Sequence, residues 1–143
     1  MSDKKLILVV DDDENLREIL VEVLTASGFL AVGVAHALQA LEHVAKFGPP
    51  ALVLMDLTMP VMDGRQLLAE RRKWATLAHV PFVLLTANTM VDAHELGVAE
   101  ILIKPVGMDQ LLAVARRYAS GRSGTYAAVT EPLADDADQR KKG

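Results

Sequence analysis

Short apolar runs alternate with amphipathic segments along most of the chain. Five runs, each the length of a buried strand, lie at residues 6–10, 29–35, 51–55, 80–85 and 100–103. Each is followed by a segment in which apolar residues recur at helical spacing, at residues 16–27, 37–47, 64–75, 89–96 and 108–119. The pattern predicts five strand–helix units in succession.

Strands that are apolar throughout, rather than at alternate positions, are buried on both faces. Such strands separated by helices are typical of a mainly parallel sheet covered by helices on both sides. We therefore predict an α/β fold with a doubly wound, five-stranded parallel sheet and five helices. In this architecture the functional site lies outside the carboxyl ends of the strands, near the point where the strand order reverses.

The size and composition of the chain suit one domain. It has 143 residues, of which 51% are hydrophobic and 24% are charged. That domain is predicted over residues 1–120. Residues 121–143 combine Gly, Ser, Pro and mixed charges with little periodicity, which is typical of a disordered C-terminal tail. No apolar run is long enough for membrane insertion, and the N-terminus turns acidic too early for a secretory signal, so a cytoplasmic protein is expected.

Cysteine content and charge exclude several function classes. The chain has no cysteine, which excludes disulfides, thiolate nucleophiles and cysteine-based zinc sites. Any metal must therefore be bound by oxygen or imidazole ligands. The formal net charge is −4, and the short basic run at residues 70–73 is too small to make a basic surface, so direct binding of nucleic acid is not expected.

Residues capable of polar chemistry follow four of the five predicted strands. The residues that follow these strands are, in chain order, Asp11 and Asp12, Asp56, Thr86 and Ala87, and Lys104 and Pro105. Because parallel strands end at the same edge of a sheet, the carboxylates, hydroxyl and ammonium are expected to converge. Clustered carboxylates repel one another, and a hard dication such as Mg²⁺ would hold them ionised. With that ion and Lys104 the charges balance, which favours transfer of a phosphoryl group to Asp56 as the nucleophile.

Four strings that occur in a fixed order resemble a known family. They are LVVDDDENLREIL, LMDLTMPVMDG, LLTA and IKP, and they span nearly all of residues 5–119. Each string alone is a weak signal, but the D-x-x-M-P-x-M-D-G pattern with the other three in order is highly specific. The chain resembles the receiver domain of two-component response regulators, in particular the single-domain, chemotaxis-regulator-like members. The resemblance implies the flavodoxin-like strand order 2-1-3-4-5.

The resemblance also implies a phosphoacceptor and a metal site. Asp56 would accept a phosphoryl group from the phosphohistidine of a partner kinase. Mg²⁺, with Mn²⁺ as the alternative ion, would be bound by Asp12, Asp56 and the backbone carbonyl of Thr58, with Asp11 assisting through water. Lys104 would pair with Asp56 and afterwards with the phosphoryl group.

Further residues acquire roles from the same resemblance. Thr86, the switch residue, would turn to hydrogen-bond the phosphoryl group, with the Ala87 backbone amide as a second donor, and the peptide bond before Pro105 is expected to be cis. Thr58 and Asn88 lie where the family tunes dephosphorylation by positioning or blocking water, and plain surface exposure is an equal alternative for both. Independently of the resemblance, Asp13 is expected to be the N-cap of the first helix rather than a metal ligand.

Two features depart from the family pattern. Many receivers have Tyr or Phe three residues before the lysine, and its ring turns inward when the threonine moves. The residue here is Ile101, which cannot make that movement, so this switch position is altered. The interval from Thr86 to Lys104 is about one helical turn shorter than is typical, and residues 89–96 have few apolar positions, so the fourth helix is expected to be short or irregular. We predict intact phosphotransfer chemistry and an altered output surface.

The favoured function is a phosphoacceptor signalling protein in a two-component phosphorelay. It would be phosphorylated by a sensor histidine kinase or phosphotransfer protein and read by a downstream protein target, and its catalysis would be limited to its own phosphorylation and dephosphorylation. The first alternative is an unphosphorylated receiver-like scaffold for protein binding. The second is an aspartyl-nucleophile phosphohydrolase, which needs a second Asp where this chain has Thr58. The oligomeric state is left open between a monomer and a weak dimer.

Overall fold

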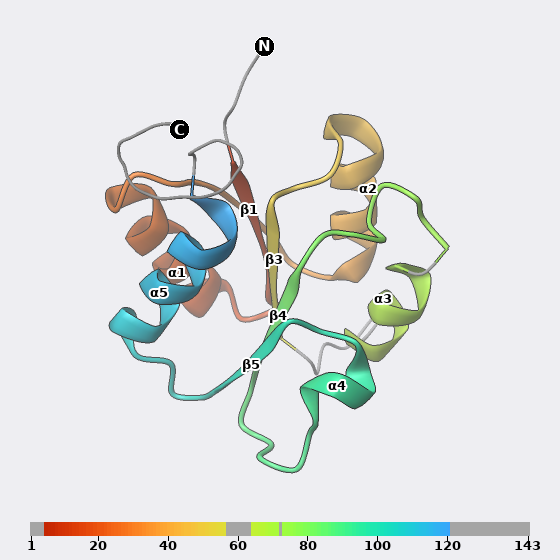
Figure 1. Ribbon diagram of the computed structural model, residues 1–143. Coiled ribbons are helices and arrows are strands. Elements are labelled where there is room, and N and C mark those ends of the chain that lie inside the picture. The colour runs from red at the N-terminus through yellow and green to blue at the C-terminus, as the bar shows by residue number, and fades with distance from the viewer. Residues whose placement is uncertain (1–4, 57–63, 72, 121–143) are drawn as a thin grey trace.

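The computed structural model describes residues 5–56, 64–71 and 73–120 (Figure 1). Within these ranges strands and helices alternate as β1 Leu6–Val10, α1 Glu14–Ala26, β2 Leu30–Val34, α2 Ala37–Phe47, β3 Leu52–Asp56, α3 Gly64–Arg71, β4 Phe82–Thr86, α4 Ala93–Leu96, β5 Glu100–Ile103 and α5 Met108–Ala119. The five strand–helix units expected from the hydrophobic pattern are confirmed. The tail expected at residues 121–143 lies outside the described residues.

The strands form one parallel sheet in the order β2-β1-β3-β4-β5, which confirms the expected topology. Figure 1 shows α1 and α5 on one face of the sheet and α2, α3 and α4 on the other. After β1 the chain adds β2 on one side, and from β3 onward it adds strands on the other side. The order therefore reverses between β1 and β3, which places the loops that follow these two strands at the crevice of the fold.

The core has two layers, one on each face of the sheet. Side chains from alternate positions of β1, β3 and β4 enter opposite layers, and nearly all of them are buried. Leu8, Val53 and Phe82 belong to the layer under α2 and α3, whereas Ile7 and Leu52 belong to the layer under α1 and α5. Burial on both faces explains why these strands appear in the sequence as continuous apolar runs.

Helix α1 begins where its capping residue predicts. The side chain of Asp13 accepts a hydrogen bond from the Leu16 amide at 3.1 Å, as expected of an N-cap. Helix α3 ends at Arg71, so the prediction of a helix up to residue 75 was too long. The segment after it turns instead, because Leu77 and Val80 are buried against the sheet. Among the described helices, none has both the length and the apolarity needed to cross a membrane.

Helix α4 has only four residues, which confirms the expected short fourth helix. It begins later than residue 89 because two side chains favour turns over helix. Asn88 Oδ1 accepts from the Met90 amide at 2.8 Å, and Asp92 Oδ1 caps α4 by accepting from the His94 and Glu95 amides. Gly97, with φ of 72°, then ends the helix in the left-handed conformation.

Candidate functional site

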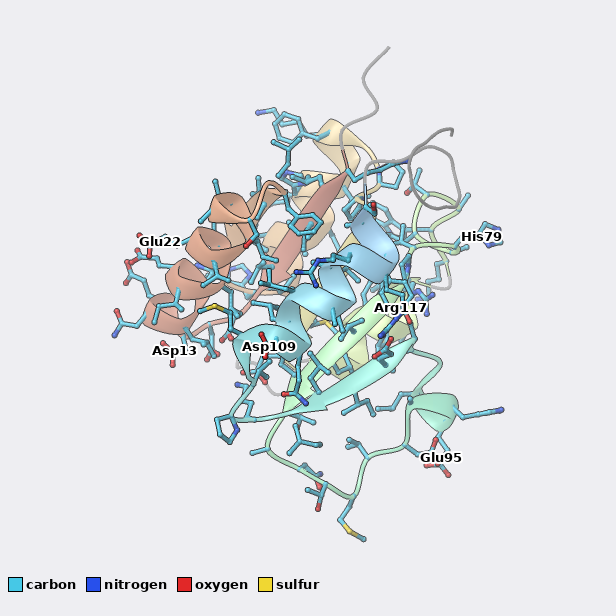
Figure 2. All side chains as sticks on the ribbon, turned by 60° about the vertical axis from the view of Figure 1, so that its left-hand side comes forward. Asp13, Glu22, His79, Glu95, Asp109 and Arg117 are labelled. Carbon is cyan, nitrogen blue, oxygen red and sulfur yellow. The ribbon has the colours of Figure 1, made fainter. Side chains whose placement is uncertain are left out.

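The carboxyl ends of four strands bring the expected site residues to one edge of the sheet. Asp56 and Thr86 are the last residues of β3 and β4, and Lys104 directly follows β5. Asp11 and Asp12 directly follow β1. This end of the molecule can be found in Figure 2 from the labelled Asp13 and Asp109. They lie at the N-terminal ends of α1 and α5, which follow the carboxyl ends of β1 and β5.

Asp11, Asp12 and Asp56 form a compact carboxylate cluster. Each of them offers a carboxylate oxygen, and these oxygens all lie within 4.8 Å of one another. Asp11 and Asp56 are buried, with 1% and 7% of their surfaces exposed, whereas Asp12 is exposed. Three carboxylates are therefore held together, two of them buried and one exposed to solvent.

Asp11 is oriented from several directions. Its amide donates to the Val34 carbonyl at 3.1 Å, and its Oδ1 accepts from the Asp13 amide at 2.9 Å. Its Oδ2 is buried and has no hydrogen-bond partner among the described residues. Burial raises the pKa of the Asp11 carboxyl, and the nearby Asp56 and Asp12 carboxylates raise it further, against the opposing effects of the Asp13 amide and Lys104.

The cluster has the donor chemistry of a magnesium site. All its donors are hard carboxylate oxygens, which Mg²⁺ prefers. A buried carboxylate oxygen without a partner, as at Asp11 Oδ2, is costly unless a cation or water compensates it. The residues present therefore fit Mg²⁺. The backbone carbonyl of Thr58, the remaining expected ligand, lies outside the described residues.

Lys104 supplies a positive charge to the cluster. Its Nζ donates to Asp56 Oδ2 at 3.1 Å, and the two side chains are 28% and 10% exposed. The backbone of Lys104 is also held in place, because its amide donates to the Thr86 carbonyl at 2.8 Å. The peptide bond between Lys104 and Pro105 is cis. An ammonium and a carboxylate are thus paired at a partly shielded position, where charge-assisted hydrogen bonds are strong.

Thr86 lies at the same edge and is linked to the loop before α4. Its side chain is buried, and its Oγ1 accepts from the Asn88 amide at 3.0 Å. Ala87 and Asn88 are exposed immediately beyond it. In the sheet, Thr86 is paired with Ile103, whereas Ile101 is paired with Leu84.

Ile101 lies away from the carboxylate cluster. It is half-buried and packs against the core layer under α2 and α3, as Val91, Leu96 and Val98 also do. The structure thus brings together the acids and Lys104 and keeps Thr86 at the adjoining strand end. Ile101 lies two residues back along β5 from Ile103, the partner of Thr86 in the sheet.

One residue at the site was missed in the sequence. Arg17 on α1 donates from its guanidinium to the backbone carbonyl of Asp11 at 2.8 Å. Its position in the second turn after an acidic loop is a weak signal, since an arginine there is more often a solvated helix residue. The contact depends on how α1 lies against β2, which the hydrophobic pattern does not define.

Comparison with known proteins identifies the family of the chain. The response regulator receiver domain model matches residues 7–116. The transcriptional regulatory protein KdpE of Mycobacterium tuberculosis is 34% identical over 137 residues, which cover 93% of this chain and 58% of KdpE. The chain therefore spans less than two thirds of that relative. The sporulation initiation phosphotransferase F of Bacillus subtilis is 33% identical over 116 residues, which cover 78% of this chain and 91% of that protein.

A solved structure agrees with the sequence comparison. The receiver domain of a sensor histidine kinase from Pseudomonas aeruginosa, with a magnesium ion coordinated in its active site cleft, has a TM-score of 0.72 and 28% identity to this chain. The match covers 81% of this chain and 98% of that one. Together with the parallel sheet and the acidic cluster at its edge, these matches show that the chain belongs to the response regulator receiver domain family.

Proposed function

We propose that the chain is a phosphoacceptor of a two-component phosphorelay, in which Asp56 takes a phosphoryl group from the phosphohistidine of a sensor histidine kinase or phosphotransfer protein. A downstream protein target would then read the change. The observation that carries the proposal is the pairing of Lys104 Nζ with Asp56 Oδ2 at 3.1 Å inside a cluster of three carboxylates. This arrangement presents one carboxylate next to a cation that can stabilise the incoming phosphoryl oxygens.

The reaction is proposed to depend on Mg²⁺, or on Mn²⁺ in its place. Asp12, Asp56 and the backbone carbonyl of Thr58 would bind the ion directly, and Asp11 would bind it through water. When bound, the ion neutralises carboxylate charge and stabilises the negative charge of the transferring group. The support is the all-oxygen donor set, the partnerless Asp11 Oδ2 and the magnesium ion in the Pseudomonas receiver.

The chain's own residues would divide the transfer among them. An oxygen of Asp56 attacks phosphorus while the bond from phosphorus to the histidine nitrogen of the donor breaks. Lys104, which holds Asp56 Oδ2, would move its hydrogen bond to a phosphoryl oxygen. The Thr86 hydroxyl and the Ala87 amide would donate to the remaining oxygens.

The response to phosphorylation would pass through the loop before α4. Thr86 Oγ1 accepts from the Asn88 amide, so a movement of Thr86 toward the phosphoryl group removes that hydrogen bond and releases the loop. Ile101 has no ring to follow this movement, and a short α4 leaves a different surface to read it. Asn88, together with Thr58, is proposed to tune hydrolysis of the aspartyl phosphate by controlling access of water.

The test is phosphorylation by a small donor. The chain is incubated with acetyl phosphate, with Mg²⁺ or with a chelator, and its intact mass is measured beside that of Asp56→Asn. A single phosphoryl group is expected on the wild-type chain, only with Mg²⁺, and none on the variant. Absence of both modification and Mg²⁺ binding would favour the unphosphorylated scaffold instead. Steady turnover of a generic phosphatase substrate would favour the phosphohydrolase.

A further inference from the structure

Arg17 connects α1 to the acidic loop that follows β1. Its guanidinium donates to the backbone carbonyl of Asp11 at 2.8 Å in a partly buried position. We propose that Arg17, seated over Gly33 of β2, is a positioning residue that directs the carboxylates of Asp11 and Asp12 toward the bound metal. The inference rests on the proposed function, because it concerns the same metal site.

The Asp11 carbonyl is an effective place from which to orient both acids. The peptide unit that carries this oxygen is planar and joins Asp11 to Asp12, so a bond that holds the oxygen also holds the plane. The plane also contains the Cα of Asp12, so only rotation about the N–Cα bond of Asp12 is left to set the direction of its side chain. A guanidinium donor makes this a charge-assisted hydrogen bond, which is stronger than a bond between neutral groups.

The other hydrogen bonds to the loop do not fix the peptide plane between Asp11 and Asp12. The Asp11 amide is tied to Val34, and Asp11 Oδ1 is tied to the Asp13 amide. Asp13 is in turn fixed as the N-cap of α1. The carbonyl oxygen of Asp11, which lies in this plane, accepts its hydrogen bond from the Arg17 side chain on α1. The partnerless Asp11 Oδ2 shows which group this arrangement presents to a cation.

Gly33 makes room for the aliphatic part of Arg17. A Cβ at position 33 would lie 2.8 Å from Cγ and 3.1 Å from Cδ of Arg17. The first distance is too short for two carbon atoms, so any larger residue would displace the Arg17 side chain. Glycine weakens a strand and often marks a close approach by another group. The approach here is by the side chain that holds the acidic loop.

A purely structural role for Arg17 would leave metal affinity unchanged. Packing of its methylenes on β2 would stabilise the fold, and its removal would lower stability equally with and without the metal. A positioning role instead predicts weaker Mg²⁺ binding in folded protein. Arg17→Met separates the two, because methionine keeps an apolar stem over Gly33 and lacks the donor.

The experiment is a calorimetric Mg²⁺ titration of the metal-free full chain at a temperature at which each variant is folded. The Kd for Mg²⁺ is expected to rise about 10-fold in Arg17→Met, as is typical when a group that orients a metal ligand is lost. Gly33→Ala should weaken binding in the same direction. It should have no further effect on Mg²⁺ binding when added to Arg17→Ala, since the remaining close neighbour, Cγ2 of Val21 at 3.3 Å, is a methyl group that cannot hydrogen-bond the loop. Arg116→Met, an exposed change of the same kind on α5, should bind like wild type.

Two results would overturn the inference while the proposed function stands. One is wild-type affinity in Arg17→Met, and the other is an equal effect of Gly33→Ala with and without the Arg17 side chain. If Arg17→Met does not fold, Gly33→Ala decides, and wild-type affinity in that variant overturns the inference. If the wild-type chain itself binds no Mg²⁺ and takes no phosphoryl group, the proposed function fails and this inference fails with it.

Discussion

The ammonium of Lys104 donates to Oδ2 of Asp56 across 3.1 Å, although the two residues are 48 positions apart in the chain. Their strands, β5 and β3, are not neighbours, because β4 lies between them. Lys104 therefore reaches across the end of β4, where its own amide is bonded to the Thr86 carbonyl. This contact joins three strand ends and places a positive charge beside the proposed phosphoacceptor.

Replacement of Lys104 by Met should separate metal binding from phosphotransfer. Loss of the ammonium removes a positive charge from a carboxylate cluster, so Mg²⁺ should bind at least as tightly as in wild type. Phosphorylation of Asp56 by acetyl phosphate should slow by about 100-fold, because a donor to the transferring group is lost. Calorimetry gives the affinity and intact mass against time gives the rate. Lys73→Met, at an exposed position, is the control, and loss of Mg²⁺ binding in Lys104→Met would contradict the assignment.

Replacement of Thr86 by Ala should disconnect the loop before α4 from the site. The Asn88 amide loses its acceptor, so its hydrogen exchange should become about 5–10-fold faster in the unphosphorylated chain, in line with loss of one hydrogen bond. Phosphorylation should still occur and should no longer change exchange in this loop. Thr86→Ser keeps the hydroxyl and serves as the control. Unchanged exchange at Asn88 in Thr86→Ala would show that the bond has no such function.

We predict that Arg71 attaches α4 to the rest of the fold. Its guanidinium donates to the carbonyls of Gly97 at 2.7 Å and Val80 at 3.0 Å, and it lies 4.9 Å from the centre of the Phe82 ring. Arg71→Met should lower the free energy of unfolding by about 2 kcal/mol, since these two carbonyls and that of Leu77, at 3.4 Å from Nε, lose a charged donor. It should also speed hydrogen exchange at the turn after α4.

Urea denaturation and exchange mass spectrometry test the Arg71 prediction. Arg116→Met offers a matched control on the surface of α5. Loss of stability without faster exchange near Gly97 would mean that the contact with the Phe82 side of the core dominates, and that α4 is held by its own packing.

Ionised Glu100 is predicted to contribute to the free energy of unfolding, and this contribution is lost in acid. Burial raises the pKa of this carboxyl. Hydrogen bonds from the Tyr118 hydroxyl at 2.7 Å and from the Arg117 guanidinium outweigh burial and hold the pKa below its ordinary value of 4.5. Figure 2 labels Arg117 near the end of α5. A lowered carboxyl pKa stabilises the fold above the unfolded pKa, and this stabilisation disappears as the pH falls through the folded pKa.

The variant that tests this is Glu100→Gln. At pH 7 it should be less stable than wild type by about 1 kcal/mol or less, because the group is partly exposed. The difference should shrink as the pH falls below 4.5. Urea denaturation at several pH values measures it, with the exposed Glu95→Gln as the control. A difference that stays constant from pH 7 to the acid range would rule out ionisation as its source.

Much of the fold could be predicted because its signals are local. Buried strands such as Leu52–Asp56 appear as continuous apolar runs, and the acids and Lys104 follow directly from where those runs end. The short α4 was also foreseen, from its few apolar positions. The end of α3 was not, because the turn after Arg71 depends on burial of Leu77 and Val80 against the sheet.

By itself, the sequence determined the order of elements, the parallel sheet and the identity of the residues at the strand ends, since hydrophobic periodicity and chain order are sufficient for these. The family resemblance already implied that Lys104 pairs with Asp56, whereas only the tertiary structure decided that Arg17 meets the Asp11 carbonyl. It also decided that Gly33 leaves space for Arg17 and that Asp11 Oδ2 is buried without a partner among the described residues. These relationships depend on distances of a few ångströms between elements packed from different parts of the chain, which no local pattern encodes.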